Sequence, residues 1–141
     1  FTPVAGKMVA VAAGKGVLHI AGTERPWRKD RLPTQLDTLP PDAFCLALSH
    51  HPDNVRWLRR HGVAFVLSGH THGGQIALPF YGAMVTLARH GKRFERGLYK
   101  VAPTSLYVSR GIGMEGGRAP RMRFCSRPEV TLIELPPASQ P

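Results

Sequence analysis

Two short apolar runs on either side of a helical segment constrain the fold of this chain more than any other feature. Phe44–Ser49 and Val63–Ser68 are continuous apolar runs, a pattern typical of strands buried on both faces of a sheet. Between them, Pro52-Asp53 suits the start of a helix and Gly62 is placed to end it. A strand–helix–strand unit this short predicts two neighbouring parallel strands, and hence an α/β fold.

Segments outside this unit add further expected strands. Met8–Ala13 and Val17–Ala21 are separated by Gly14-Lys15-Gly16, which is typical of a β-hairpin. Four later segments also have the composition of strands: Gln75–Leu78, Gly97–Val101, Leu106–Ser109 and Val130–Leu135. In Thr23–Pro41, four prolines limit any helix to about Leu32–Leu39. The sequence therefore predicts a mixed sheet with few helices.

Length and composition indicate one globular unit. The chain has 141 residues, of which 43% are hydrophobic and 20% are charged, and this excludes a disordered tail or a coiled coil. No apolar run approaches the ~20 residues that span a bilayer. We expect one domain over residues 1–135 and a tail over residues 136–141. Because Phe1 is not an initiator residue, we expect a processed product or a piece of a longer protein.

The charge of the chain is strongly positive. Nineteen Lys and Arg residues against nine Asp and Glu residues give a formal net charge of +10. Such a balance suits polyanionic partners, which include nucleic acid, an anionic membrane surface and phosphorylated substrates. A basic surface that only faces solvent explains the charge equally well.

Histidines gather just after both buried runs. His50 and His51 follow the first run, and His70 and His72 follow the second. The carboxyl ends of neighbouring parallel strands meet at one edge of the sheet, where ligands bind in open α/β folds. In an extended backbone, His70 and His72 would project to the same side. Since imidazole is the commonest metal ligand among side chains, this pattern predicts a metal site.

Several short blocks surround these histidines in a fixed order. Gly69-His70-Thr71-His72-Gly73-Gly74-Gln75 is preceded by Ser49-His50-His51-Pro52-Asp53. The blocks that follow are Leu78-Pro79, Gly97-Leu98-Tyr99, residues 106–113 and Arg127-Pro128-Glu129-Val130. In order and spacing they resemble the carboxy-terminal half of the calcineurin-like metallophosphoesterases, most closely the bacterial membrane-associated or exported branch. The resemblance covers about Gly16 to Leu135.

The resemblance implies both a fold and an activity. The family fold is a four-layer α-β-β-α sandwich, of which this chain would be the carboxy-terminal half. The implied enzyme hydrolyses phosphate mono- or diesters, lipid- or nucleotide-linked among them, with water activated by two divalent ions (Mn, Fe or Zn). By resemblance, His50 and His70 bind one ion and His72 the other, with His51 as the second choice to His50. Arg110 is the implied substrate contact, and the branch implies membrane association or export from a bacterial cell.

The motifs of the family's first half are missing from this sequence. They are Asp-x-His, Gly-Asp-x-x-Asp and Gly-Asn-His-Asp/Glu, which supply the bridging carboxylate, most other ligands and the histidine that acts as general acid, so no catalytic residue is assigned here. Two dications about 4 Å apart repel by about 17 kcal/mol at an effective dielectric of about 20, and neutral imidazoles do not offset this. We therefore expect at most one weakly bound ion, no activity of the chain alone, and the amino-terminal half of the same domain as its partner.

Two other classes of function stay open. In the first, the chain is a non-catalytic basic module that binds anionic lipid or nucleic acid through Arg118, Arg121, Arg123 and Arg127 near Phe124. No RNA- or DNA-binding motif occurs and the aromatic residues do not alternate with the basic ones, which makes nucleic acid the less expected partner. In the second, the chain is a degenerate relative whose histidines have no function.

Overall fold

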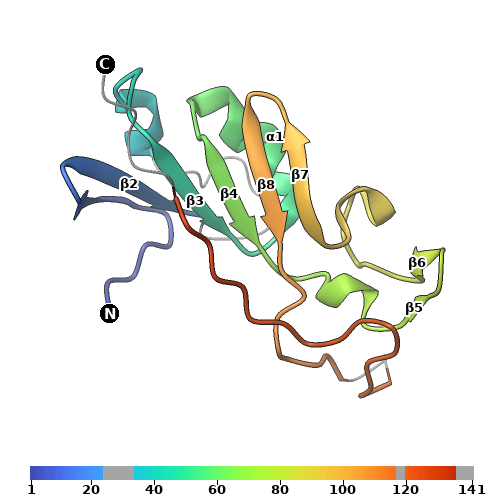
Figure 1. The fold of residues 1–141 in the computed structure, drawn as a ribbon. Helices are drawn as coiled ribbons and strands as arrows, with labels where there is room; N and C mark the ends of the chain where they lie inside the picture. Colours follow the sequence, from blue (N-terminus) through green and yellow to red (C-terminus); the bar gives the residue numbers. More distant parts are fainter. Residues whose placement is uncertain (24–33, 117–119, 136–141) are drawn as a thin grey trace.

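The framework of the molecule is a mixed six-stranded sheet with the strand order β1-β2-β3-β4-β8-β7 (Figure 1). The computed structural model describes residues 1–23, 34–116 and 120–135. The strands of this sheet are β1 (Met8–Ala13), β2 (Gly16–Gly22), β3 (Cys45–Ser49), β4 (Phe65–Ser68), β7 (Gly97–Val101) and β8 (Thr104–Val108). A separate two-stranded sheet pairs β5 (Ala77–Leu78) with β6 (Gly82–Ala83).

Parallel pairing dominates the centre of the large sheet. Strands β2, β3, β4 and β8 run parallel, while β1 and β7 pair antiparallel at the two edges. The expected hairpin of β1 and β2 and the expected parallel neighbours β3 and β4 are both confirmed. The fold class is confirmed as α/β with a mixed sheet and few helices, consistent with part of a metallophosphoesterase sandwich.

The connection from β3 to β4 is helical, as expected. It consists of η3 (Pro52–Asn54), α1 (Val55–Leu58) and η4 (Arg59–His61). Gly62 ends it in the left-handed region at φ 74°, a conformation that glycine adopts without steric cost. The other helical turns among the described residues are η2 (Thr34–Thr38), η5 (His72–Gly74) and η6 (Gly91–Phe94). Thr34–Thr38 falls inside the range expected for a helix before Pro40, whose first residues lie outside the described part.

The core lies between α1 and one face of the sheet. Val55 and Leu58 of the helix are fully buried, and alternate residues of β3, β4 and β8 point toward them. The core contains Ala21, Leu36, Cys45, Ala47, Val55, Leu58, Val63, Val66, Phe94, Leu106 and Val108. On the other face Leu48 is 39% exposed, and Phe44 just before β3 is 41% exposed. The two-sided burial expected for this run is therefore wrong at both residues, because α1 covers one face only.

The segment 130–135 does not form the expected strand. It passes across the side of the sheet opposite α1 (Figure 1), where the Tyr107 hydroxyl lies 2.8 Å from Thr131 Oγ1 and donates to Glu129 Oε1 at 3.2 Å. Strand hydrogen bonds lie in the plane of a sheet, so a segment that crosses its face cannot join the ladder. The strand expected at Gln75–Leu78 is also shorter, because Gln75 has a positive φ of 53°.

Two expectations fall on residues outside the described part of the chain. Residues 136–141 lie there, so the division into a domain over 1–135 and a tail stays a prediction. Arg118 also lies there, so its expected contact with an anionic partner stays a prediction. Among the residues that are described, no helix has the length and apolar character needed to cross a membrane.

Candidate metal centre

The ends of β3 and β4 bring three histidines together. Ser49 pairs with Ser68 in register, so the two strands end level with one another. The Gly69 amide then donates to the carbonyl of His50 at 3.2 Å. His50 and His51 on one strand end therefore lie beside His70 on the other, as the topology of parallel strands predicts.

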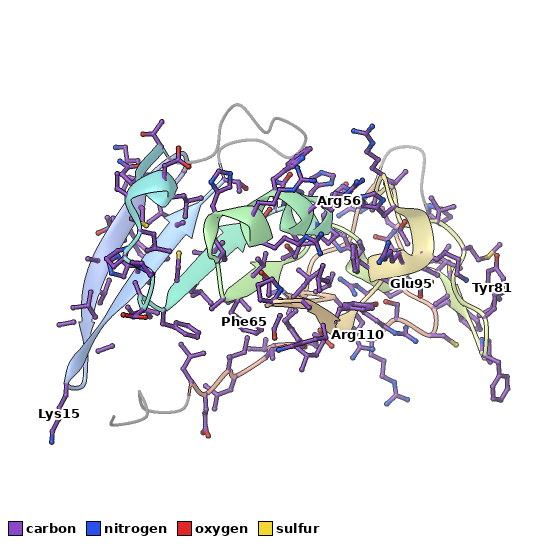
Figure 2. All side chains as sticks on the ribbon, turned by 90° about the horizontal axis from the view of Figure 1, so that it is seen from above. Lys15, Arg56, Phe65, Tyr81, Glu95 and Arg110 are labelled. Atoms are coloured by element: carbon purple, nitrogen blue, oxygen red, sulfur yellow. The ribbon has the colours of Figure 1, made fainter. Side chains whose placement is uncertain are left out.

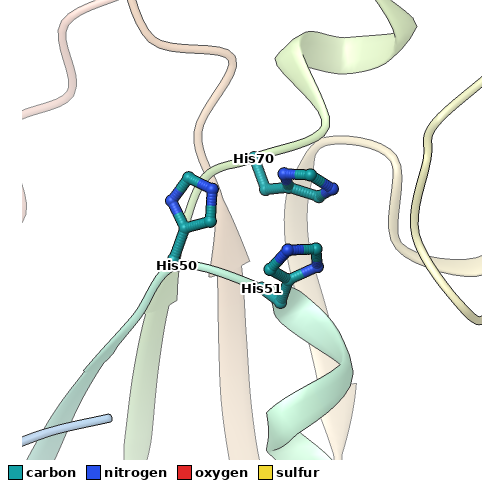
Figure 3. A group of neighbouring side chains, drawn as sticks. All are labelled: His50, His51 and His70. Atoms are coloured by element: carbon teal, nitrogen blue, oxygen red, sulfur yellow. The ribbon is translucent and has the colours of Figure 1, made fainter. Parts of the chain in front are cut away.

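The three imidazole rings form a compact group, which we call the strand-end cluster (His50, His51 and His70; Figure 3). One ring nitrogen from each residue lies within 4.8 Å of the others. The ring centroids of His51 and His70 are 3.5 Å apart, and His50 lies 5.2 and 5.0 Å from them. Within the described residues it is the single group of three or more His, Cys, Asp and Glu side chains with the spacing of a metal site.

Burial lowers the pKa of two members of the strand-end cluster, His51 and His70. Burial, together with smaller effects of the neighbouring His70 and His50, lowers the pKa of His51 to about 3. The pKa of His70 is also lowered, mainly by burial, against the raising effect of its hydrogen bond to the Leu87 carbonyl. His50 is exposed at the mouth of the group. Neutral imidazole is the form that binds a metal ion.

Backbone contacts orient the cluster. His70 Nε2 donates to the Leu87 carbonyl at 3.2 Å, which places the ring proton on Nε2 and the lone pair on Nδ1. The nearby Asp53 is 3% exposed, but its carboxylate accepts the backbone amides of Arg89 and His90 at 2.9 and 3.1 Å. Asp53 therefore holds the loop that carries Leu87 in place.

A tight turn after β4 separates His70 from His72. Both residues have left-handed backbones, with φ values of 69° and 50°, and Gly73 follows at 63°. The extended backbone on which the expected same-side projection of the two side chains rested is therefore absent. His70 joins the strand-end cluster, whereas the ring of His72 lies beside Gly113 and Arg123.

His72 belongs to a second group, which we call the loop clamp (His72, Gln75, Arg123 and Ser126). His72 Nδ1 lies 3.2 Å from the Gly113 carbonyl oxygen and 3.1 Å from Arg123 Nη2. Its carbonyl oxygen accepts the Ser126 hydroxyl at 2.5 Å and Arg123 Nη1 at 3.4 Å. The assignment of His72 to a metal stays a prediction.

The rest of the loop clamp joins distant backbone segments. Arg123 donates to the carbonyls of Arg110 at 2.8 Å and Ser126 at 3.2 Å, and also bonds the Gly113 carbonyl. The buried Gln75 amide donates to Glu115 O at 3.1 Å and Pro120 O at 2.7 Å. Its own oxygen accepts the Glu115 amide at 2.7 Å. The contacts of Gln75, and that of Ser126 with His72, were not visible in the sequence, since their partners are about 40 to 54 residues apart.

Arg110 is held by an acidic partner. Its Nε and Nη2 contact Glu129 Oε2 at 2.6 and 2.5 Å, and its backbone amide donates to Glu129 Oε1. Burial raises the pKa of Glu129, but the Arg110 contacts and the Tyr107 hydroxyl outweigh it and leave the pKa below its usual value. A substrate contact by Arg110 stays a prediction. Of the other arginines expected to meet phosphate, Arg123 lies in the loop clamp, while Arg121 and Arg127 are exposed.

The residues of the strand-end cluster fit one divalent ion. Three imidazole ligands suit Zn, Mn or Fe, but the group contains no carboxylate to offset a second dication. His51, which the sequence suggested only as an alternative to His50 as a metal ligand, lies in the cluster. His72 does not belong to the cluster. The residue before a proline is held extended, and the His51 backbone at φ −96° and ψ 134° turns its ring back toward His70.

Comparison with known proteins identifies relatives of this chain. It is 45% identical over 92 residues to the uncharacterized metallophosphoesterase YkuE of Bacillus subtilis, and the aligned part covers 65% of this chain and 31% of the relative. It is 37% identical over 90 residues to phosphodiesterase YaeI of Escherichia coli (64% and 32%). With the UDP-2,3-diacylglucosamine pyrophosphatase LpxG of Chlamydia trachomatis it shares 39% over 95 residues (62% and 28%).

These alignments define the extent of the relationship. The chain spans about a third of the length of these relatives. No family model and no solved structure matches it. Several relatives are named metallophosphoesterases, and this chain has an α/β sheet and a histidine cluster that could hold a metal ion. Over about two thirds of its length, this chain is homologous to bacterial metallophosphoesterases, consistent with the calcineurin-like superfamily.

Proposed function

We propose that this chain is part of a metal-dependent phosphoesterase in which the strand-end cluster holds one divalent ion. The observation that carries this proposal is the position of three imidazoles at the carboxyl ends of parallel strands. The homologous proteins are named metallophosphoesterases, a phosphodiesterase and a pyrophosphatase. The proposed substrates are therefore phosphate mono- or diesters, including those linked to lipids or nucleotides.

The chain's own residues would prepare the site for the ion. A bound divalent ion supplies Lewis-acid activation of water and stabilises charge on the phosphoryl oxygens. His51 stays neutral through burial, and the Leu87 carbonyl fixes the orientation and the proton of His70. His72 is the proposed ligand of a second ion through Nε2, because its Nδ1 faces Gly113 and Arg123. Arg110, oriented by Glu129, is the proposed contact for a substrate phosphate.

We also propose that the chain alone is not active. A second dication needs nearby carboxylates to offset a repulsion of about 17 kcal/mol, and the strand-end cluster has none. Because the chain spans about a third of its relatives, the amino-terminal half of such a protein is the proposed source of the bridging carboxylate and the general acid. Mn, Fe and Zn are the proposed ions.

Calorimetric titration with Mn²⁺ and Zn²⁺ tests the metal site. We expect one weakly bound ion per chain and no more, with binding lost in His70→Ala. His61→Ala is the matched control, because His61 lies at the far end of the helical connection from His51 and faces Asp37. Binding that survives His70→Ala, or that His61→Ala removes equally, contradicts the proposed site.

An activity assay tests the incomplete site. With Mn²⁺ and an aryl phosphodiester, we expect the rate of hydrolysis by this chain to equal that of buffer. Turnover that disappears in His70→Ala and persists in His61→Ala contradicts the proposed inactivity and shows that the chain completes its own site.

A further inference from the structure

A cluster of large apolar side chains lies exposed on the two-stranded sheet and the loop after it. Leu78 is 42% exposed, Phe80 111%, Tyr81 61%, Met84 57%, Val85 60% and Leu87 69%. We call these six residues the β5–β6 patch. The hairpin projects from the body of the molecule (Figure 1), and Tyr81 lies at the opposite end from Lys15 of the β1–β2 hairpin (Figure 2). Contiguous apolar exposure of this kind marks an interaction surface.

The exposure of the patch follows from how the hairpin is attached. The small residues Ala77 and Ala83 face inward and are buried. Ala83 packs on Gly74, and its amide donates to Glu95 Oε2 at 3.0 Å. The hairpin is thus fixed by its small side chains and backbone, so its large side chains carry no part of the core.

Positive charge borders the patch. Arg89, Lys92 and Arg93 follow it in sequence and are exposed. Lys92 Nζ lies 3.2 Å from the centre of the Tyr81 ring and donates to the Tyr81 carbonyl, which places one cation directly on the patch. Glu95, the one acidic residue over 78–96, is only 13% exposed at its side chain and faces Lys92. The accessible charge beside the apolar residues is therefore positive.

We propose that the β5–β6 patch docks onto an anionic lipid bilayer. Its apolar tip enters the interface between headgroups and acyl chains, while Arg89, Lys92 and Arg93 contact lipid phosphates. Aromatic side chains such as Phe80 and Tyr81 are favoured at this depth. Charge complementarity selects this occupant, since cations border the apolar tip and the net charge of the chain is +10.

The docked orientation has a consequence for the metal centre. Leu87, at the end of the patch, accepts the hydrogen bond from His70, so docking brings the strand-end cluster toward the lipid headgroups. The docking itself is independent of the proposed hydrolysis. Its consequence, that the substrates are phosphate esters at a membrane surface, rests on the proposed function.

Vesicle co-sedimentation tests the apolar part of the proposal. The chain is mixed with phosphatidylcholine vesicles, with and without phosphatidylglycerol, and we expect binding to the anionic vesicles. Phe80→Ser should weaken this binding by about tenfold or more, because a large side chain no longer enters the bilayer. The matched control is Val17→Ser, 56% exposed on the β1–β2 hairpin, which should bind as the original chain does.

A pair of charge variants tests the electrostatic part. Arg89→Gln with Arg93→Gln should weaken binding by about 30-fold at low salt. Lys7→Gln with Lys15→Gln removes the same charge from exposed positions on and beside the other hairpin and should have little effect. Absence of binding to anionic vesicles, or equal losses in test and control variants, overturns the proposal and leaves the patch as a protein interface. Metal titration of the same samples reports separately on the proposed phosphoesterase.

Discussion

The strand-end cluster and the loop clamp begin in the same short motif and differ in what surrounds their histidines. The His70 ring stacks on His51, with centroids 3.5 Å apart, and its neighbours are imidazoles. The His72 ring, two residues later, lies against a backbone carbonyl and the Arg123 guanidinium. One group offers closely spaced ring nitrogens to a cation, whereas the other already contains the positive charge of Arg123.

This difference teaches that spacing alone does not decide which chemistry a histidine can perform. The turn after β4 does, because the left-handed residues at 70, 72 and 73 send the two side chains to different neighbours. The cluster is made by strand ends that are adjacent by topology. The clamp depends on contacts between His72 and residues far along the chain, the Gly113 carbonyl and Arg123 among them.

The largest expected effect comes from disturbing the turn that separates the two groups. Gly74→Ala should lower the free energy of unfolding by about 3 kcal/mol, measured by urea denaturation. Gly74 has φ 83°, and an added Cβ would lie 2.2 Å from Ala83 Cβ. Gly14→Ala is the control, with φ 59° and no atom within 4 Å, and should cost only about 1 kcal/mol. Equal losses would contradict the role of this close contact.

A smaller effect should separate the clamp from the cluster. Arg123→Ala removes donors to the carbonyls of Arg110, Gly113 and Ser126, and should lower the free energy of unfolding by about 2 kcal/mol. Arg121→Ala, at an exposed position two residues earlier, should change it little. The Mn²⁺ affinity of both variants should equal that of the original chain, because neither touches the cluster. Lost affinity in Arg123→Ala alone would show that the two groups are coupled.

Local and topological features were predictable from the sequence. The parallel strands β3 and β4 follow from two apolar runs around a helical segment that Gly62 ends. The meeting of His50 and His70 follows from the same unit, because parallel neighbours end at one edge of the sheet. The family resemblance rested on sequence blocks and agrees with the relatives found.

Features that depend on distant contacts were not predictable. Val130–Leu135 has strand composition, yet it crosses a sheet face and is held by Tyr107. The different hydrogen-bond partners of His70 and His72 depend on positive φ values at non-glycine residues, which no periodicity reveals. The place of Arg123 in the clamp likewise depends on carbonyls that only the folded loop supplies.

The pH dependence of stability should sharpen the contrast further. The folded chain keeps His51 neutral to about pH 3, whereas the unfolded chain takes up a proton near pH 6.5. The unfolded state therefore binds more protons between these values, and the free energy of unfolding should fall as the pH falls, by at most about 1.4 kcal/mol per pH unit for this residue. Urea denaturation between pH 6.5 and pH 5.5 measures this slope above the range in which Glu129 takes up its proton in the unfolded chain. An unchanged slope in His51→Asn would contradict the assignment.

The smallest expected effect is the most direct comparison of the two histidines. His72→Asn should lower the Mn²⁺ affinity of this chain by no more than about tenfold, which is the loss expected when a residue only orients a ligand. His70→Ala, in contrast, should abolish binding. The reason is geometric, because His72 lies outside the group whose nitrogens are within 4.8 Å of one another. Calorimetry on both variants measures the difference. If the two substitutions abolish binding equally, both histidines bind the same ion. The strand-end cluster and the loop clamp are then not separate sites. If His72→Asn reduces two ions to one, the chain itself carries the second metal site that its missing carboxylates argue against.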